Sequence, residues 1–549
     1  MLNPSNPSAG VYGKIIDLSE RIPNVSSSVA AFVGEAEMGE VGVPVLVTDT
    51  GDRQAKFGTL NPQRYGFAGY SLNQFLKVAN RAYFLRVVNG AKTALSYLTV
   101  DDTAAQNPVI RLVNNTIQGT NTPQGVDDPL NTVGFLPTQP GVANIMGYFC
   151  AANPGKWNNN ITISVAPSNP QGVALRGNGH NPRHFVVSVW YGALIAGVGA
   201  TERFVVSRNY EVDENGNQMY IEDVINSRSR YIRFKNNELC PVFDIVTSAS
   251  ETMNGGLDGA RATDAQIIQA WDKFNDPERI EVSILVNSGY TNHNIHHKML
   301  QVAEQRGDAY AILDMPSDKQ QVADAITYRR QTLNANTFYG GIYAPDVLIY
   351  DEFTDRQIYV PISGYIATVM AYTDNTKFLW FAPAGINVGI LNVLGLRHSY
   401  DQGARDALSE AQVNHVRKLP QGLGYCVWSQ YTLYNRASSF QDCNVVRLSL
   451  YILKASKRFT TNKLFDPQDR FLRAQVKTAA DDFMTPIQNN RGVYEYSNIC
   501  DERNNTPDII ANNDLVLDMI YDPVIATKRI HVRFNLNPKG SRMTDVTAA

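Results

Sequence analysis

The sequence predicts a multidomain α/β plus α+β protein: a discontinuous α/β core with an inserted β-rich domain, then a C-terminal α+β domain, with extended arms at both ends. Three observations predict it. The chain has 549 residues, whereas single domains typically hold about 100–150. Buried-strand runs alternate with helical stretches in two separated parts of the chain. Between those parts lies a stretch rich in Pro, Gly and Asn, where short apolar runs alternate with turns.

Composition narrows the functional classes. The chain carries 49 Lys+Arg and 52 Asp+Glu, a net charge of −3, so no global basic field attracts nucleic acid. No apolar run approaches the ~20 residues of a membrane span, and the N-terminus lacks the basic and apolar regions of a signal peptide. The five cysteines are widely spaced without a C-x-x-C pair, so we expect reduced thiols in a cytoplasm-like compartment.

The first segment with strand character has no visible partner. Residues 11–18 are β-prone, but Pro23 soon interrupts, and nothing nearby in sequence resembles a hairpin partner. A frayed terminus and an arm that pairs elsewhere are both consistent with this pattern. The α/β pattern begins afterwards, with buried-strand runs at 29–34 and 82–88 and helical spacing over 70–78.

Residues 96–240 change character. Helical periodicity disappears, and short strand-like runs such as 161–165 and 185–189 alternate with turns. The α/β pattern returns from 241 to 400, where strand, helix and strand follow at the spacing of a parallel βαβ unit. The predicted strands there are 280–286, 309–313, 347–350 and 378–381, and the predicted helices are 292–306 and 319–330.

The C-terminal third alternates helices and strands. We predict helices at 409–418 and 445–459, and strands at 425–433, 515–521 and 530–536. The last of these alternates strictly and places four apolar residues on one face, so it is a candidate for pairing with a sheet edge. Around it lie five basic residues without an acidic one: Lys528, Arg529, Arg533, Lys539 and Arg542. They either discourage aggregation of an edge strand or complement an acidic partner surface.

These patterns divide the chain into five parts. We expect an N-terminal arm at 1–22, an α/β core formed by 23–95 and 241–400, an inserted β-rich domain at 96–240, a C-terminal domain at 401–527, and a strand and tail arm at 528–549.

The strong enzyme motifs are absent from the sequence. Pro154-Gly155-Lys156-Trp157 lacks the leading glycine and the Ser/Thr of a phosphate-binding loop, and no G-x-G-x-x-G fingerprint occurs. Neither G-x-S-x-G nor H-E-x-x-H occurs. We therefore expect no catalytic, cofactor or metal site.

Two weaker constellations remain as alternatives. His293, His296 and His297 would share one face of a helix, which suits a metal, but no nearby carboxylate completes a ligand set, so we expect solvated surface. Ser363 is followed by His398 and His415, which keeps an α/β hydrolase as the alternative from a different class.

Short motifs occur in the order of one family along nearly the whole chain. Gly255-Gly256-Leu257-Asp258-Gly259 is similar to its "GGxDG" loop, and Ile312-Leu313-Asp314-Met315-Pro316 to its "ilDxP" strand end. Val360-Pro361-Ile362-Ser363-Gly364 resembles "vPpSG". Gly424 to Leu433 resembles "GyrvWGaRTL", with Ser429 and Tyr431 in place of the usual Gly and Arg. The chain thus resembles the tail sheath proteins of contractile bacteriophages and related contractile injection systems.

The resemblance implies a structural protein without enzymatic activity or cofactor. Sheath subunits assemble as stacked hexameric rings around a tail tube, and their contraction drives the tube through the host cell envelope. The implied partners are further copies of the chain, the tail tube, and the baseplate and tail terminator proteins, without nucleic acid or membrane insertion. The implied location is the virion tail, after assembly in the host bacterial cytoplasm. A sheath of a phage-derived bacteriocin or other injection particle is the close alternative.

The resemblance also implies a role for the terminal arms. In this family, arms of one subunit add strands to a sheet in neighbouring subunits, and the two unpartnered β segments fall where such arms belong. We hypothesise that these segments are the exchanged strands and that the five basic residues support their contacts. The strand residues concerned are Val11, Tyr12, Ile15, Ile16, Leu18, Ile530, Val532, Phe534 and Leu536.

Overall fold

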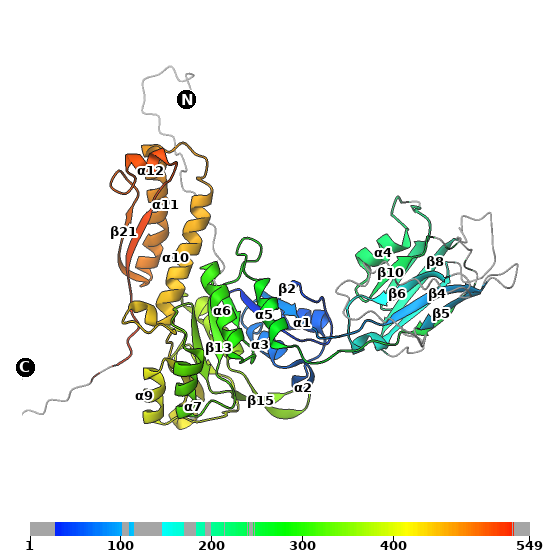
Figure 1. Cartoon of the computed structure of the whole chain (residues 1–549), viewed down its shortest axis with the longest axis horizontal. Helices are drawn as coiled ribbons and strands as arrows, with labels where there is room; N and C mark the ends of the chain where they lie inside the picture. The colour runs from blue at the N-terminus through cyan, green and yellow to red at the C-terminus, as the bar shows by residue number, and fades with distance from the viewer. Residues whose placement is uncertain are drawn as a thin grey trace, which may run out of the picture. The chain divides into compact units, whose positions relative to one another are not determined.

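The computed structural model describes residues 28–101, 109–114, 145–168, 183–192, 199–212, 215–238, 240, 245, 247–529 and 531. The chain divides into two compact units, whose elements are labelled in Figure 1. Among the described residues, the smaller unit contains 380–382 and everything from 451 onwards, and the larger contains the rest. The mixed α/β multidomain class predicted from the sequence is confirmed.

A nine-stranded sheet forms the centre of the larger unit. Its interior strands run parallel, and antiparallel strands complete both edges. Two distant parts of the sequence meet where Ala30 pairs with Ile284. In spatial order the strands are β17 (Ile390–Leu391), β20 (Tyr425–Val427), β19 (Val413–Lys418), β14 (Gly340–Ala344), β13 (Tyr310–Asp314), β12 (Ile284–Val286), β1 (Ala30–Gly34), β3 (Ala82–Arg86) and β2 (Pro44–Val47).

Both faces of this sheet are buried. Along β1, Ala30 and Phe32 belong to one hydrophobic core, whereas Ala31 and Val33 belong to another. Continuous apolar runs are typical of parallel strands covered on both faces. Helices α3 (Ala68–Phe75) and α8 (Ser363–Thr376) contribute to the first core, and α5 (Asp264–Asp272) and α6 (His293–Arg306) to the second.

Shorter elements complete this part of the larger unit. A separate three-stranded sheet has the strand order β16-β15-β18. The remaining elements are α1 (Thr50–Phe57), α2 (Pro62–Tyr65), α7 (Val322–Thr327), a π-helical turn (Tyr328–Leu333), β15 (Val347–Asp351), β16 (Arg356–Val360), β18 (Gly395–Leu396) and α9 (Gln402–Glu410).

Two four-stranded sheets share one core in the β-rich part of the chain, whose strands extend from residue 95 to residue 252, beyond the predicted end at 240. The first sheet has the order β10-β6-β4-β5 and the second the order β11-β7-β8-β9. The sheets also pack with a helix, α4 (Ile221–Arg228), which the sequence did not predict. The strands are β4 (Leu95–Asp101), β5 (Val109–Asn114), β6 (Ile145–Ala151), β7 (Ile161–Pro167), β8 (His184–Tyr191), β9 (Glu202–Ser207), β10 (Ile232–Asn236) and β11 (Ala249–Thr252).

The chain segments that enter and leave the β-rich part run side by side. Lys92 and Leu257 exchange two backbone hydrogen bonds, of 2.8 and 3.0 Å. Nearby, the buried guanidinium of Arg86 donates to the carbonyl oxygens of Ala36 at 3.0 Å and of Pro154 at 2.9 Å. One cation thus joins the core to the inserted part by hydrogen bonds to neutral carbonyls.

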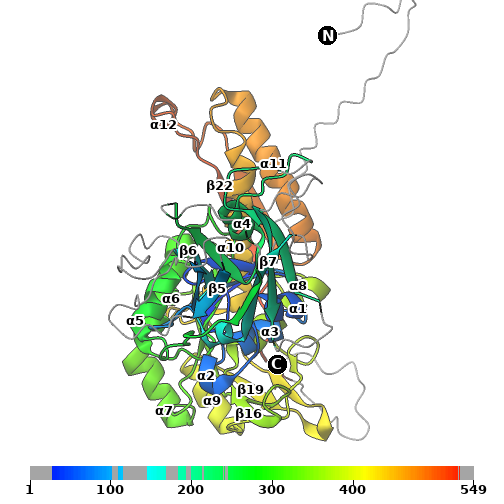
Figure 2. The same ribbon diagram turned by 90° about the vertical axis from the view of Figure 1, so that its right-hand side faces the viewer.

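The smaller unit contains a helical hairpin and a two-stranded ribbon. Helix α10 (Cys443–Thr461) leads into it, and α11 (Arg470–Asn489) begins at Asp469, whose side chain accepts a hydrogen bond from the amide of Leu472. The rings of Tyr451 and Phe483 pack with centroids 5.6 Å apart. Helices α10 and α11 are labelled in Figure 2. The ribbon consists of β21 (Val493–Ile499) and β22 (Asp518–Pro523), joined through α12 (Pro507–Ala511).

Several sequence predictions need correction. The helix predicted at 409–418 is wrong. Helix α9 ends at Glu410, and the residues that follow form β19 of the central sheet. Four consecutive residues of β19, from Val413 to Val416, are buried, as in a strand covered on both faces. Residues 378–381 form turns instead of a strand, and the strand predicted at 425–433 ends at Val427. The helix predicted at 319–330 is shorter and passes into the π-helical turn.

Other predicted helices and strands are confirmed. Helices overlap 70–78, 292–306 and 445–459, and strands overlap 29–34, 82–88, 161–165, 185–189, 280–286, 309–313, 347–350 and 515–521. The five cysteines are buried and free. In the described part of the chain, no helix combines the length and apolar character needed to span a membrane.

Candidate assembly surface

The β21–β22 ribbon has one face packed on a helix. Tyr496 pairs with Tyr521 across the ribbon, and the Tyr496 hydroxyl lies 2.8 Å from the Thr485 hydroxyl on α11. On the same face, the Asn498 amide donates to Asp481 of α11 at 3.0 Å. The alternation of a strand therefore directs its other face to solvent.

The outer face of the ribbon is acidic. Glu495 lies directly opposite Asp522, and Ser497 lies opposite Ile520. All four side chains are exposed, and Ile520 retains 57% of its accessible surface. Neither carboxylate forms an ion pair within the described residues. Like charges directly opposite on a sheet are destabilising, so this face favours a basic partner.

The ribbon also has open edges. In the described residues, β21 pairs only with β22, and no third strand joins either of them. A two-stranded ribbon thus presents backbone hydrogen-bonding groups along its two outer edges, a template for strand addition. The register shifts between Val493 and Glu495, and such a bulge increases the local twist.

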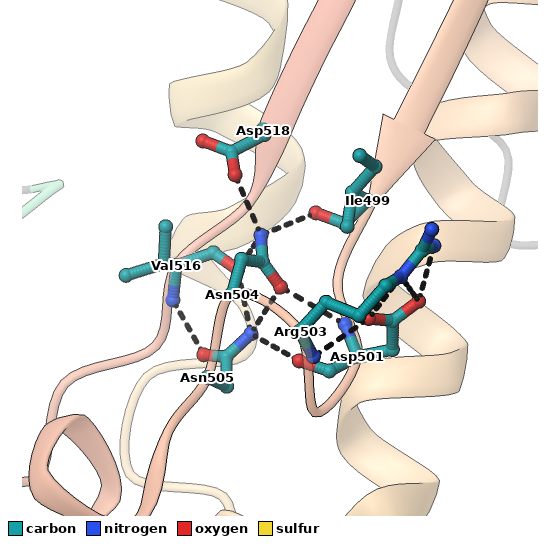
Figure 3. A network of polar contacts seen from close by, with 7 residues as sticks. All are labelled: Ile499, Asp501, Arg503, Asn504, Asn505, Val516 and Asp518. Atoms are coloured by element: carbon teal, nitrogen blue, oxygen red, sulfur yellow. Dashed lines mark hydrogen bonds and ion pairs between the residues drawn. The ribbon is translucent and has the colours of Figure 1, made fainter.

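A polar network fixes the end of the ribbon (Figure 3). The Asn504 amide nitrogen donates to the carbonyl oxygen of Ile499 at 2.7 Å and to Asp518 at 3.0 Å. Buried Asn505 exchanges hydrogen bonds with the backbone of Val516, at 2.8 and 2.9 Å. These contacts join the end of β21 to the start of β22 and so hold the spacing of the two open edges.

An ion pair completes the turn in this network. The Arg503 guanidinium donates to both carboxylate oxygens of Asp501, at 2.7 to 3.1 Å. These hydrogen bonds lower the pKa of Asp501 to about 2. The opposite charges of Asp501 and Arg503 therefore cancel in this turn, whereas the rest of the ribbon is acidic.

Asn505→Ala is expected to loosen the ribbon. The substitution leaves the part-buried amide of Val516 without its acceptor and its carbonyl with only the 3.2 Å hydrogen bond from Asn504, at a cost of about 2 kcal/mol. Hydrogen exchange of the β22 amides should accelerate by about tenfold or more. Exposed Asn512, which follows α12, provides the control: Asn512→Ala should leave exchange unchanged. Equal protection in Asn505→Ala and the wild type would contradict this role.

The predicted arm residues lie mostly beyond what the structure describes. Residues 11–18 lie outside it, as do Ile530, Val532, Phe534 and Leu536. Of the basic residues, Lys528 and Arg529 are described and exposed, whereas Arg533, Lys539 and Arg542 are not described. The strand exchange therefore remains a prediction.

The serine and histidines of the hydrolase alternative are not brought together. Buried Ser363 starts α8, and its hydroxyl donates to Asp314 at 2.6 Å and accepts from the Ser288 amide at 3.0 Å. His415 is buried beside Ser429 in the central sheet. Within the described residues, neither His415 nor His398 hydrogen-bonds to Ser363.

Asp314 receives three hydrogen bonds in the interior. The Ser363 amide donates to Oδ1 at 2.7 Å, and the Gly289 amide and the Ser363 hydroxyl donate to Oδ2. Burial raises the pKa of Asp314 to about 7, although the hydrogen bonds from Ser363 act in the opposite direction. The motif aspartate at the end of β13 thus joins the loop after β12 to the start of α8.

The histidine prediction is wrong for one residue. His296 is fully buried, and its Nδ1 lies 3.0 Å from the Tyr328 hydroxyl, whereas His293 and His297 are exposed. Burial lowers the pKa of His296 to about 3. No group of three or more possible metal ligands occurs within the described residues. His296 is buried because α6 packs on the π-helical turn.

Acid is expected to destabilise the chain through His296. The native side chain stays neutral while the unfolded one gains a proton below its usual pKa of about 6.5, so stability falls as pH decreases from there. Between pH 7 and pH 4, the wild type should lose about 3 kcal/mol more than His296→Leu in denaturant unfolding. His297→Gln, at the exposed neighbour, should retain the wild-type pH dependence. Parallel profiles for His296→Leu and wild type would contradict the assignment.

Comparisons with known proteins identify the family. Residues 260–433 match the phage tail sheath protein central domain, and residues 436–537 match the phage tail sheath C-terminal domain. Together these matches cover half of the chain. The chain belongs to the phage tail sheath family.

Curated relatives agree with this assignment. The chain is 27% identical over 318 residues to the tail sheath protein of Enterobacteria phage T4, which covers 54% of this chain and 48% of that protein. It is 28% identical over 361 residues to the tail sheath protein of Vibrio phage KVP40, with 61% and 53% covered. This sheath-family chain spans about half the length of the curated relatives it matches.

Solved structures share the fold. A sheath tail protein from Listeria innocua matches with a TM-score of 0.58 at 11% identity, over 91% of this chain and 92% of that one. The sheath complex of an extracellular contractile injection system in its contracted state matches with a TM-score of 0.52 at 12% identity, over 97% and 99%. The sequence motifs predict this family, but they do not predict the acidic ribbon, although residues 493–499 have the Tyr-rich composition typical of a strand.

Proposed function

We propose that the chain is a structural subunit of a contractile tail sheath. It would polymerise as stacked hexameric rings around a tail tube and contract to drive the tube through the host cell envelope. The match of two consecutive sheath domains, at 260–433 and 436–537, carries this proposal. The tube, baseplate and tail terminator are its proposed partners, and the virion tail its proposed location. A bacteriocin or other injection particle remains the alternative, since a sheath of that kind shares the fold.

The β21–β22 ribbon is the proposed acceptor of strands from neighbouring subunits. Its open edges can each accept an extended segment, which would continue the ladder of backbone hydrogen bonds. The alternating residues 530–536 and the β-prone residues 11–18 are the proposed donors. Because donor and acceptor are different segments of the same chain, such contacts would propagate from copy to copy.

Charge supports this pairing of donor and acceptor. The outer face of the ribbon carries Glu495 and Asp522, directly opposite each other, whereas the sequence from 528 to 542 contains five basic residues and no acidic one. A basic strand would relieve the repulsion between the two carboxylates. Electrostatic complementarity of this kind chiefly fixes the register and the choice of partner.

The energetics of one arm explain why assembly should be cooperative. Ordering seven residues costs about 7–14 kcal/mol of backbone entropy. About five ladder hydrogen bonds return ~1 kcal/mol each, and four apolar side chains return ~1.5–3 kcal/mol each. A single docked arm is therefore near balance, so a stable polymer needs many arms at once.

Negative-stain electron microscopy of the purified chain across a concentration series tests the proposal. We expect hollow, striated cylinders above a critical concentration, if necessary only after tail tube is added as a nucleus. Discrete particles at every concentration, with and without tube, would contradict the proposed function. A serine-directed fluorophosphonate probe tests the hydrolase alternative in the same samples: we expect no labelling of buried Ser363, and stoichiometric labelling would favour the enzyme.

A further inference from the structure

A polar pocket of about 480 Å³ opens on the larger unit. Its walls come from the π-helical turn, the end of α9, and the segment after β20. Two arginines, Arg329 and Arg330, line it together with one carboxylate, Glu410. The other lining residues are Asn334, Ser409, Ala411, Gln412, Tyr431, Asn435 and Gln441.

Arg329 is a buried cation without an anionic partner. It is only 3% exposed. Its Nη2 donates to the Leu433 carbonyl at 2.8 Å, to Gln412 at 2.9 Å and to Asn435 at 3.2 Å. Its Nε has no hydrogen-bond partner in the described part of the chain, and no described carboxylate forms an ion pair with it. Burying an unpaired charge costs free energy, so we expect the guanidinium to bind an anion.

The backbone around the pocket adopts uncommon conformations. Arg329 and Arg330 belong to a π-helical turn, a form that occurs mostly as short insertions at functional sites. Asn334 and Gln412, on opposite walls, have φ values of 36° and 60°, in the left-handed region that non-glycine residues seldom occupy. The strained residues line the pocket itself, as expected where a site is held in a defined geometry.

We propose that this pocket is a binding site for an oxyanion, a carboxylate or phosphate group, held by the guanidinium groups of Arg329 and Arg330. The planar guanidinium can donate two parallel hydrogen bonds to the oxygens of a carboxylate or a phosphate, and such charge-assisted bonds are among the strongest that it forms. Burial and, to a smaller extent, the neighbouring charge of Arg330 lower the pKa of Arg329 to about 10. At neutral pH both arginines remain charged, so an anion would relieve their repulsion.

The walls of the pocket provide variants with opposite expected effects. Arg330 is exposed and makes no ion pair among the described residues, so its replacement should leave the fold intact. Glu410 is exposed at the end of α9, where its charge opposes an anion. Exposed Arg356 on β16 lies outside the pocket and serves as a matched control.

Equilibrium dialysis of the unassembled full-length chain against radiolabelled inorganic phosphate, at constant ionic strength, tests the site. We expect one saturable site per chain. Arg330→Gln should raise its Kd about tenfold, the effect of one charged hydrogen bond. Glu410→Gln should lower the Kd about threefold, and Arg356→Gln should leave it unchanged. Absence of saturable binding, or equal weakening by Arg330→Gln and Arg356→Gln, would overturn the proposal.

A second arm of the experiment distinguishes the source of the oxyanion. If an acidic side chain of another subunit occupies the pocket, saturating phosphate should raise the critical concentration for polymerisation of the wild type, relative to sodium chloride of equal ionic strength. In that case, Arg330→Gln should also raise the critical concentration, without added phosphate. If the occupant is a free anion, polymerisation should be unaffected by phosphate. Because dialysis uses unassembled chains, its outcome is independent of the proposed sheath function.

Discussion

Reversing the two opposed carboxylates of the ribbon is expected to block polymerisation. In Glu495→Lys/Asp522→Lys, the outer face of β21–β22 would repel the basic segment at 528–542 instead of attracting it. The ribbon itself should persist, because one like-charge pair replaces another. Each lost attraction is small, but it recurs at every contact of the polymer. We expect the critical concentration, measured by sedimentation at low salt, to rise about 10- to 100-fold.

A control variant and a compensating variant test this prediction about the ribbon. Glu278→Lys/Glu304→Lys changes the net charge equally at exposed positions far along the chain from the ribbon and should polymerise normally. Reversing the basic segment with Lys528→Glu/Arg529→Glu should restore polymerisation only in the ribbon variant. Normal polymerisation of Glu495→Lys/Asp522→Lys would show that the basic segment does not bind this face.

Asp314→Ala should have the largest effect on stability. The substitution leaves three donors without an acceptor in the interior: the amides of Ser363 and Gly289, and the Ser363 hydroxyl. Removing the acceptor of a buried polar network costs about 3–5 kcal/mol. Denaturant unfolding of the full chain, followed by circular dichroism, should show this as an earlier transition of the larger unit.

Two matched variants isolate the network. Ser363→Ala removes only the hydroxyl contact and should cost about 1 kcal/mol. Asp318→Ala lies a few residues further along, where the side chain is 72% exposed and paired only with Lys319, so it should change stability by less than about 0.5 kcal/mol. An Asp314→Ala variant as stable as Asp318→Ala would refute the structural role of the carboxyl.

The parts of the fold that the sequence predicted well share a physical reason. Strand β1 is a short, wholly apolar run, and β13 is apolar up to its last residue, Asp314. Helix α6 has both an Asn292 cap and a glycine end, so local signals suffice. The sequence wrongly predicts a helix over β19, because β19 begins only two residues after α9 ends. Its strand state depends on pairing with β14, a partner far away in sequence.

The candidate sites, like β19, depend on contacts between residues that are far apart in the sequence. The family motifs predicted the assembly role, but the acidic face depends on the register that places Glu495 opposite Asp522, and register across an 18-residue connection cannot be read from either strand alone. The histidine spacing correctly predicted a helix, yet only packing on Tyr328 decides that His296 is buried. The oxyanion pocket joins residues 329 to 441 through a π-helical turn, for which the sequence has no clear signal.

The paired entry and exit of the β-rich part have a consequence for how sheath proteins diversify. Lys92 and Leu257 are hydrogen-bonded neighbours, so the core imposes a single geometric condition on whatever is inserted between them: its two ends must emerge side by side. Insertions that meet such a condition are well tolerated by their host domain. We therefore expect changes of length within the β-rich part to leave the register of the central sheet unchanged.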